Sequence, residues 1–597
     1  MMINSHGLKA AALALPLLSL APAVAQPAAG GPDSRAMAIR VGPNVVLSRD
    51  PEAGHIETDI AVNPIDGSNL VAASISMTME DGSATCTVYS SRDSGVTWTE
   101  VRFPASTGGV DPQVAFGPGG TAYFLKIEYP PSLDRAGAVA FYRSEDGGVV
   151  WTEASLPLSD HPQMVVDLGS PKFKGRVYFS GMYNVRRPGL MWSADEGRSF
   201  QGPIDIPNPN GYWLLNDAPQ VLRDGTLFIP FRLWDDRSGA ETIRTVSAFV
   251  LSPDGGQTFT ELRRIFEHPH FRFSPPPNYP GTFVHREATP MYAVDRSREF
   301  DRIYMAWSDT RLGQPRVFLS YSDDRGSSWA EPVPVSPAVP GESSQWLPML
   351  AVNASGVVAL AWQDSRDDPS GHAVHYYFSA SPDGRSFLPA HRLTRVEGRP
   401  FAGANLRLAP NWVQTRNGAQ QLAFSSAYRR WPEGGDYMGM AADPSGVFHP
   451  LWADARTGVF QLMSSEVHVT PPAPPPAGVT TADVTGDVQL LFGRPRYEPA
   501  TKQTIVPVRL RNRSTRPLYP PFVVRLDSLK YLDVRAGGVR ADSIDYSSTL
   551  GDLGMLPPGR ATEPREWTLR SSTVREMATV NVTIEARVQI GATATRP

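Results

Sequence analysis

The sequence predicts an all-β protein in which a β-propeller is followed by a small β-sandwich. A short phrase with a serine, an aspartate, a glycine and an aromatic residue recurs at spacings of roughly 50 to 70 residues, which is typical of propellers and solenoids. Short β-branched and aromatic runs lie between turn residues, as they do in antiparallel strands. Helical periodicity is almost absent. These observations favour strands that repeat around a ring.

The first 25 residues have the pattern of a secretory signal peptide. Lys9 precedes an apolar run, and Ala23 and Ala25 are the small residues that signal peptidase requires. We expect residues 1–25 to be removed and the protein to be secreted, either outside the cell or into a periplasm. No later stretch reaches the roughly 18 apolar residues of a membrane span.

Residues 38–469 are expected to form the propeller. Each unit contains a first strand such as "DPQVAFGP", a second strand that ends in an aromatic residue, a third strand, the aspartate phrase and an outer strand. Seven first-strand phrases favour seven blades, whereas six copies of the aspartate phrase leave six blades possible. The last unit lacks an outer strand, which residues 38–48 could supply by closing the ring.

The C-terminal part is expected to form a separate unit. Residues 470–483 contain the run "PPAPPPAG" and are expected to be a proline-rich linker, because this composition does not suit a sheet or a helix interior. Residues 484–597 hold spaced strand patterns that fit an immunoglobulin-like β-sandwich of accessory type.

Composition narrows the classes of partner. The chain has 56 basic and 60 acidic side chains and no long run of lysine or arginine, so a nucleic-acid partner is not expected. Cys86 is the single cysteine, which excludes an intrachain disulfide and fits a small buried side chain. We expect a monomer whose partner is a glycan or an extracellular protein.

The aspartate phrase reads "SRDSGVTW" in its first copy, at residues 91–98. An aspartate in such a turn accepts backbone N–H bonds, a glycine permits positive φ, and the aromatic residue packs into the blade. The phrase resembles the Asp-box, or BNR repeat, of sialidases and related propellers. The resemblance implies a structural role for its aspartates, on the face opposite the ligand: Asp93, Asp146, Asp195, Asp254 and Asp324.

The other face of the propeller carries a second recurring motif. "WDDR", "WSDTR", "WQDSR" and "WADAR" each follow a second strand. In one interpretation the aspartate caps the turn and the arginine pairs with it. In the other, several arginines converge on an anionic ligand, because guanidinium groups match carboxylate geometry. The starts of the first strands add further polar groups: Glu57, Asp59, Asp111, His161, Asp217, Glu287 and Asp436.

The resemblance to sialidases implies specific roles on this face. An arginine cluster would bind the carboxylate of the substrate, and the matching residues are Arg237, Arg311, Arg366 and Arg456. A tyrosine nucleophile assisted by a glutamate would be Tyr437 with Glu287, and the acid/base would be Asp59 or Asp111. The family's "[FY]-R-[IL]-P" phrase is missing, and "GDYMG" differs from its tyrosine motif. Ordinary placement at a strand start therefore remains an alternative for Tyr437 and Glu287.

No metal or cofactor is expected. His161 and His285 lie near carboxylates but have no HExxH or comparable spacing. Three functional hypotheses follow. The first is a secreted sialidase-like exo-glycosidase that acts on acidic glycans at the mouth of the propeller. The second is a non-catalytic propeller that binds a glycan or a protein outside the cell. The third and weaker hypothesis is a polysaccharide lyase.

Overall fold

The structure is a computed structural model of the chain. It describes residues 37–78, 83–103, 108–129, 138–158, 160–183, 187–208, 213–234, 244–269, 271–272, 285–286, 289–336, 343–368, 373–400, 403–414, 420–426, 431, 433–470, 479–499, 501–536, 539–550, 555–572 and 577–589. In this part of the chain the only helices are the 3₁₀ turns η3 (Gly403–Leu406), η4 (Thr485–Asp487) and η5 (Ser547–Thr549). None of the helices it contains is long and apolar enough to cross a membrane.

Seven antiparallel sheets follow one another in chain order among these residues. Blade 1 contains β3 (Ala53–Asn63), β4 (Asp66–Thr78), β5 (Ala84–Ser91) and β6 (Thr99–Arg102). Blade 2 contains β7 (Gly108–Phe116), β8 (Ala122–Tyr129), β9 (Ala138–Ser144) and β10 (Thr152–Leu156). Blade 3 contains β11 (Asp160–Val166), β12 (Val177–Tyr183), β13 (Arg187–Ser193) and β14 (Gln201–Asp205). Blade 4 contains β15 (Trp213–Asn216) with β16 (Gln220–Val221), then β17 (Leu227–Trp234), β18 (Arg244–Ser252) and β19 (Arg263–Pro269).

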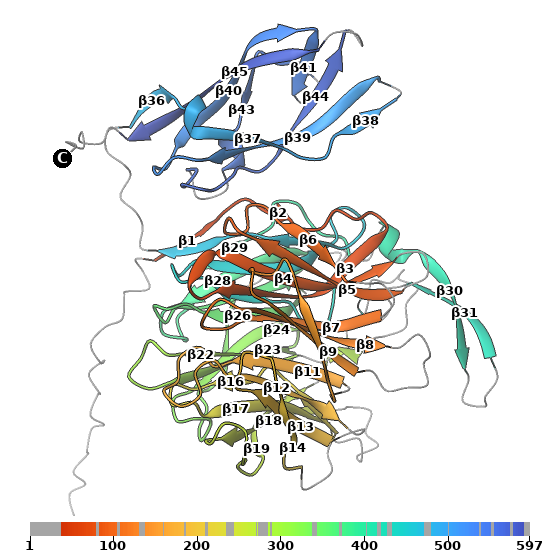
Figure 1. Cartoon of the computed structure of the whole chain (residues 1–597), viewed down its shortest axis with the longest axis vertical. Helices are drawn as coiled ribbons and strands as arrows, with labels where there is room; N and C mark the ends of the chain where they lie inside the picture. Colours follow the sequence, from red (N-terminus) through yellow and green to blue (C-terminus); the bar gives the residue numbers. More distant parts are fainter. Residues whose placement is uncertain are drawn as a thin grey trace, which may run out of the picture.

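The remaining blades repeat the same order from the inner to the outer strand. Blade 5 contains β22 (Met291–Asp295), β23 (Arg302–Asp309), β24 (Arg316–Ser322) and β25 (Val333–Pro334). Blade 6 contains β26 (Gln345–Val352), β27 (Val358–Asp364), β28 (His375–Ser381) and β29 (His391–Arg392). Blade 7 contains β32 (Met440–Ala442), β33 (Phe448–Asp454) and β34 (Gln461–Ser464). Two additional hairpins are β20 (Phe271–Arg272) with β21 (His285–Arg286), and β30 (Leu408–Gln414) with β31 (Gln420–Ser426), which projects from the ring (Figure 1).

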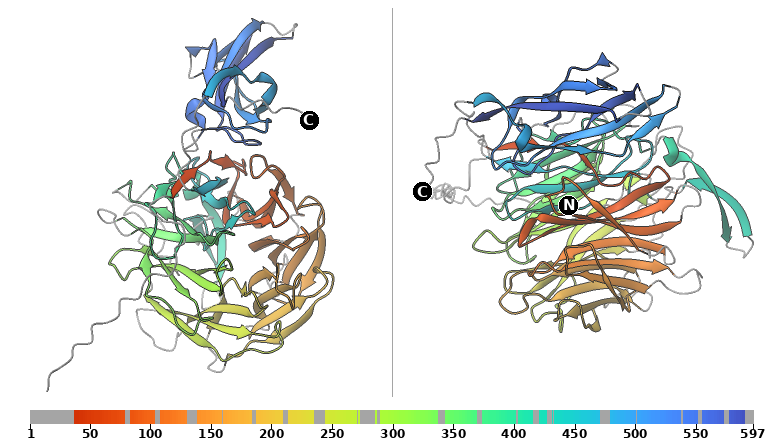
Figure 2. Two further views of the ribbon diagram at one scale, coloured as in Figure 1. Left: turned by 90° about the vertical axis from the view of Figure 1, so that its left-hand side faces the viewer. Right: turned by 45° about the horizontal axis from the view of Figure 1, so that its top comes forward.

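The ring closes between blade 7 and blade 1. The inner strands contact their neighbours in turn, and β3 contacts β32 and β33 (Figure 2, left). The N-terminal strand β2 (Val45–Val46) pairs with β34 as the outer strand of blade 7, and β1 (Ala38–Val41) pairs with β35 (Val467–Thr470). The sequence-based prediction that residues 38–48 complete the last blade is therefore confirmed. The fold is a propeller, and its described residues form seven blades, the number that the sequence favours.

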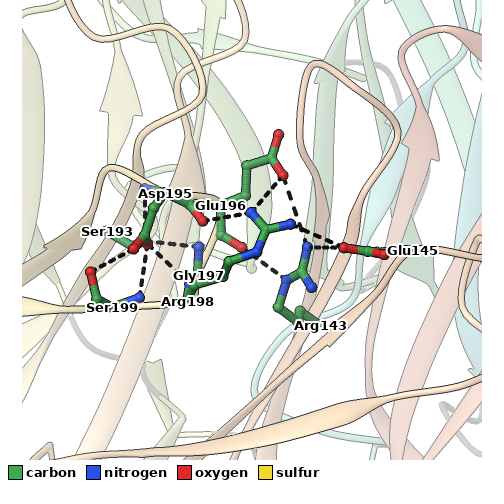
Figure 3. Close-up of polar contacts among 8 residues, drawn as sticks. All are labelled: Arg143, Glu145, Ser193, Asp195, Glu196, Gly197, Arg198 and Ser199. Carbon is green, nitrogen blue, oxygen red and sulfur yellow. Dashed lines mark hydrogen bonds and ion pairs between the residues drawn. The ribbon is translucent and has the colours of Figure 1, made fainter.

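The repeated aspartate phrase forms the turn between a third strand and an outer strand, as Figure 3 shows for blade 3. The backbone N–H and the hydroxyl of Ser199 donate to Asp195 at 2.8 and 2.6 Å, and the hydroxyl of Ser193 donates to it at 2.8 Å. Gly197 has φ of 81° and donates its N–H to Ser193. The bonds from Ser199, followed by those from Ser193 and the amide of Arg198, hold the pKa of Asp195 well below its usual value.

The other copies of the turn are built in the same way. In each of them the serine donates to the aspartate, and the aspartate accepts backbone amides further along the turn; the aspartates are Asp93, Asp146, Asp254, Asp324 and Asp383. Neighbouring turns are also linked, because Arg143 donates to the carbonyl of Glu196 and pairs with Glu145 (Figure 3). These aspartates hold the architecture, which is the role that the sequence predicts for them.

A two-sheet sandwich follows the propeller. One sheet contains β36 (Val479–Asp483), β45 (Thr579–Gln589), β40 (Tyr519–Lys530) and β43 (Ser543–Asp545). The other contains β37 (Val488–Phe492), β38 (Arg496–Glu498), β39 (Gln503–Asn512), β44 (Arg565–Ser571), β41 (Leu532–Ala536) and β42 (Val539–Arg540). Its core includes Trp567 and Tyr546. Because β36 is already paired with β45, the sandwich begins inside the segment expected to be linker; residues 471–478 lie outside the described part.

The sandwich docks on the rim of the ring at blades 7 and 1, above the propeller in Figure 1. Arg511 lies 3.3 Å from the carboxylate of Asp93, and Arg509 donates to the carbonyl of Val96 at 3.0 Å. Arg560 donates to the carbonyl of Ser94 and pairs with Glu466, beside the seam where β1 joins β35. The first aspartate turn is therefore also a docking point for the sandwich.

Candidate functional site

We call the end of the ring where the inner strands begin the mouth face, and the end with the aspartate turns the turn face. Four inner strands carry the same irregularity near the mouth face. A non-glycine residue with positive φ occupies a bulge in each, at Glu57, Asp111, His161 and Leu347. Such a conformation is rare for residues other than glycine and is maintained only where surrounding contacts fix it. The bulges take three polar residues, Glu57, Asp111 and His161, out of the regular strand pairing at equivalent positions of their blades.

Asp59 lies two residues after the first bulge and joins blade 1 to blade 2. Its Oδ2 accepts the N–H of Val114 at 2.9 Å, and its Oδ1 accepts the N–H of Ile60. Gln113 occupies the same position in blade 2, where its Oε1 accepts the N–H of Met164 at 2.8 Å. Burial raises the pKa of Asp59 to about 7, although the amides of Val114 and Ile60 lower it in part. Asp59 is thus an inter-blade contact that can also hold a proton near neutral pH.

Tyr437 brings the start of blade 7 to this group of carboxylates. Its hydroxyl donates to the carbonyl of Pro112 at 3.3 Å, next to Asp111, and the neighbouring N–H of Asp436 donates to Glu57 at 3.4 Å. Burial, followed by the charges of Glu57, Asp111 and Asp59, raises the pKa of Tyr437 well above its usual value. Tyr437, Asp59 and Asp111, which the sequence proposes as catalytic, therefore lie in one neighbourhood together with Glu57.

The second motif forms the same set of contacts in blades 5, 6 and 7. We call this set, in which a tryptophan and an arginine both donate to the aspartate between them, the clamp. In blade 6 the indole N–H of Trp362 donates to Asp364 at 2.8 Å, the backbone N–H of Arg366 donates to it at 2.9 Å, and the guanidinium of Arg366 pairs with it. Trp307, Asp309 and Arg311 repeat this arrangement, as do Trp452, Asp454 and Arg456. Each clamp aspartate is buried and has three partners within its own motif.

The clamp arginines extend toward the outer strands. Arg366 lies 4.1 Å from the ring centre of Tyr377 on the third strand and donates to Ser336, which follows the outer strand of blade 5. Arg456 donates to Asn44, which precedes the outer strand β2. The geometry matches the structural interpretation of the motif. Binding of an anionic ligand by Arg311, Arg366 and Arg456 stays a prediction.

Two of the proposed site residues, Arg237 and Glu287, lie outside the described residues, so their roles also stay predictions. No group of three or more His, Cys, Asp or Glu side chains suited to holding a metal ion occurs in the part of the chain that the structure describes.

Several basic side chains of the described residues are buried, among them Arg232 and Lys126. Arg232 in β17 pairs with Asp217 at 2.8 Å, with side chains 7% and 1% exposed. Burial raises the pKa of Asp217 to about 6, against the opposing effect of Arg232. Lys126 in β8 is fully buried and lies 3.0 Å from Glu128. Neither residue belongs to a recurring motif; "YFLKIEYP" gives no sign that its lysine is buried.

No protein-family model matches the chain, and no curated protein sequence matches it. Among solved structures, a protein of unknown function from Dyadobacter fermentans has a TM-score of 0.38 and 12% identity, over 72% of this chain and 99% of its own. A Hadza microbial sialidase has a TM-score of 0.35 and 16% identity, over 66% of this chain and 73% of its own. The GH93 alpha-L-arabinofuranosidase of Fusarium graminearum has a TM-score of 0.29 and 13% identity, over 61% and 95%. Likeness at this level carries no conclusion about activity.

Proposed function

We propose that the chain is a carbohydrate-active propeller of glycoside-hydrolase type, with its reaction centre at Tyr437, Glu57 and Asp111 on the mouth face. One observation carries the proposal: a tyrosine and three carboxylates from blades 7, 1 and 2 meet at the starts of the inner strands, where the charges of Glu57, Asp111 and Asp59 act on Tyr437. Groups with strongly shifted pKa values that gather in one place are characteristic of reaction centres.

The residue types suit hydrolysis of a glycosidic bond. Such a reaction needs an acid that protonates the leaving oxygen and a second group that attacks or stabilises the sugar. Tyr437 would be the attacking group only if a neighbouring carboxylate accepted its proton, and Glu57 and Asp111 are the candidates for that base. Asp59, whose pKa is raised to about 7, would supply the proton.

The clamps bear on the class of glycan. Arg311, Arg366 and Arg456 each have their own aspartate, so their charge is already balanced before any ligand arrives. The carboxylates around Tyr437 would repel an anionic sugar. We therefore propose that the substrate is a neutral glycan rather than an acidic one. A sialoside serves as the acidic comparison in the experiment below.

A non-catalytic binding propeller is the second candidate. It is favoured by the hydroxyl of Tyr437, which donates to a backbone carbonyl, as a tyrosine with a positioning role would do.

Four finer features belong to both candidates: the Asp-box identity of the repeated turn, the immunoglobulin-like character of the sandwich, the signal peptide and secretion. Each of them is an expectation from the sequence.

The test is hydrolysis of a panel of aryl glycosides by the protein from residue 26 onward, with neutral pyranosides and furanosides beside a sialoside. Tyr437→Phe should lower turnover at least about 100-fold, since general acid–base and nucleophilic groups each contribute at this scale. Tyr377→Phe is the matched control, because it removes from a third strand a hydroxyl that donates to Asp367.

Each outcome decides between the candidates. Turnover that is lost in Tyr437→Phe and kept in Tyr377→Phe supports the hydrolase. Equal turnover in both variants removes Tyr437 from the reaction. Absence of turnover on every substrate, together with glycan binding that Tyr437→Phe weakens, supports the binding propeller.

A further inference from the structure

The proposed reaction centre spans the junction where the ring closes. Tyr437 lies at the start of blade 7, whereas Glu57 belongs to β3 of blade 1. The backbone N–H of Asp436 donates to Glu57 across this junction, and the two residues are 379 positions apart in the chain. The distance between the proposed nucleophile and its carboxylate therefore depends on how blade 7 is fixed to blade 1.

The backbones of the two blades lie very close together on both sides of the tyrosine. The N–H of Glu57 donates to the carbonyl of Gly434 at 3.0 Å. A Cβ on Gly435 would lie 2.7 Å from the backbone nitrogen of Glu57, and one on Gly439 would lie 2.9 Å from the Cα of Asp59. Such distances leave no room for a side chain, so both positions require glycine. Residues 434–439 therefore lie backbone against backbone on the inner strand of blade 1.

Thr58 is the side chain that fastens this contact. It is 0% exposed, and its hydroxyl donates to the carbonyl of Leu451 in β33 at 2.8 Å. The same oxygen accepts the N–H of Gly439 at 3.4 Å, and Thr58 forms a parallel β-bridge with Met438. One buried hydroxyl thus binds two segments of blade 7, and its bridge partner directly follows the proposed nucleophile.

The bulge of an inner strand does not itself require a threonine. In blades 2, 3 and 6 the residue directly after the one with positive φ is a proline, at Pro112, Pro162 and Pro348. Proline has neither a hydroxyl nor a backbone N–H, so these bulges form without both groups. Among the four bulged strands, threonine occupies this position only in blade 1, where its bonding partners belong to blade 7.

We propose that Thr58 is a positioning residue of the reaction centre, whose hydroxyl fixes residues 434–439 on blade 1 and so sets the distance between Tyr437 and Glu57. The inference rests on the proposed function, since only a reaction across the junction needs that distance to be fixed. The hydroxyl bonds to backbone atoms and adds no charge beside the carboxylates. Misplacement of a reacting group by about 1 Å can lower a rate about 100-fold.

Three variants of the full chain test this role. Thr58→Val removes the hydroxyl at nearly constant volume, and Thr58→Ser keeps it; Thr58→Ala replaces the valine variant if the latter does not fold. Thr394→Val is the matched control, because Thr394 is 1% exposed and its hydroxyl accepts the N–H of Tyr376 at 3.1 Å in blade 6. Hydrogen exchange of residues 436–442 and the kcat and KM for aryl glycosides are measured for each variant.

Thr58→Val should raise the exchange rate of residues 436–442 at least about tenfold, whereas Thr58→Ser and Thr394→Val should leave it nearly unchanged. It should also lower kcat at least about tenfold with little change in KM, because the hydroxyl bonds to backbone atoms and the effect falls on the geometry of the reacting groups. The serine variant should restore both values.

Two results overturn the proposal. One is exchange in Thr58→Val that is no faster than in Thr394→Val, because the hydroxyl would then not fix the segment. The other is faster exchange with an unchanged kcat, because the contact would then serve the closed ring and not the reaction. A natural protein that hydrolyses no glycoside refutes the proposed function instead. The exchange measurement needs no substrate, so the two failures are distinguishable.

Discussion

The two faces of the propeller use aspartate in opposite ways. On the turn face, Asp195 lies near solvent and accepts bonds from two serine side chains and from backbone amides, so its pKa is lowered. On the mouth face, burial raises the pKa of Asp59 to about 7 and that of Asp217 to about 6. The comparison shows that the residue type does not set the charge state. The number of donors and the access of water do.

The clamps lie between these extremes. Asp364 is as buried as any carboxylate of the mouth face, yet it has an indole N–H, a backbone N–H and a guanidinium as partners. Full pairing makes it a structural element although it stands at the mouth end of its blade. A buried carboxylate is therefore a candidate catalytic group only where its hydrogen-bond and ion-pair partners do not balance its charge.

The largest expected effect concerns a clamp. Asp364→Ala should lower the free energy of unfolding by about 3 to 5 kcal/mol, because it leaves the guanidinium of Arg366 and the indole of Trp362 without their buried partner. Urea unfolding followed by tryptophan fluorescence measures the loss. Asp324→Ala on the turn face is the comparison and should cost less than half as much. A loss below about 1 kcal/mol for Asp364→Ala would contradict the clamp.

Asp59→Asn should have an effect that grows with pH. The native pKa of Asp59 is raised from 3.8 to about 7, so its favourable contribution is fully present below pH 4 and is lost as the pH rises through 7. The asparagine does not titrate and resembles Gln113 in the next blade. The free energy of unfolding of the variant should therefore rise by about 3 to 4 kcal/mol relative to that of the natural protein between pH 4 and pH 8. Thermal or urea unfolding across this range measures the gain, and a constant difference would contradict it.

How much the sequence predicts follows from how local each feature is. Strand alternation and the aspartate phrase are local patterns, so they predict the blades, and the missing outer strand of blade 7 points to residues 38–48. The clamp is local as well, since Asp364 lies two residues before Arg366. Local spacing left open whether that arginine faces a ligand or its own aspartate, and the structure supplies the pairing.

The site was less accessible to sequence analysis. The bulges at Glu57 and Asp111 shift the pairing register of the strand just before Asp59 and Gln113, and a bulge has no reliable sequence signal. Lys126 reads as an ordinary polar residue of an alternating strand. Its burial depends on Cys86 and Phe103 in the neighbouring blade, which are distant in the chain.

Asp195→Ala should produce a moderate loss with the opposite pH dependence to Asp59. The variant removes the carboxylate that accepts bonds from two hydroxyls and two backbone amides, and it should lower the free energy of unfolding by about 1 to 2 kcal/mol. Because the native pKa is lowered, the contribution is present above the unfolded value near pH 4 and is lost as the pH falls below it. Urea unfolding at pH 7 and at pH 3 compares the two conditions. A loss of stability that is larger at pH 3 than at pH 7 would contradict the lowered pKa of Asp195 and its role as a hydrogen-bond acceptor on the turn face.

The smallest expected effect distinguishes one turn from the others. Arg511 reaches Asp93 from the sandwich at 3.3 Å, and its side chain is 27% exposed, so the pair is partly screened by water and salt. Arg511→Ala should cost about 0.5 to 1 kcal/mol at low ionic strength and less in 0.5 M salt. Arg525→Ala is the matched control, because Arg525 pairs with Glu585 inside the sandwich. Hydrogen exchange of residues 91–98 is the more specific measure. It should increase in Arg511→Ala and not in Arg525→Ala, since only the first contact joins the sandwich to that turn. Equal exchange in both variants would mean that Arg509 and Arg560 hold the interface without Arg511, and that Asp93 differs in nothing from the other aspartates of the turn face.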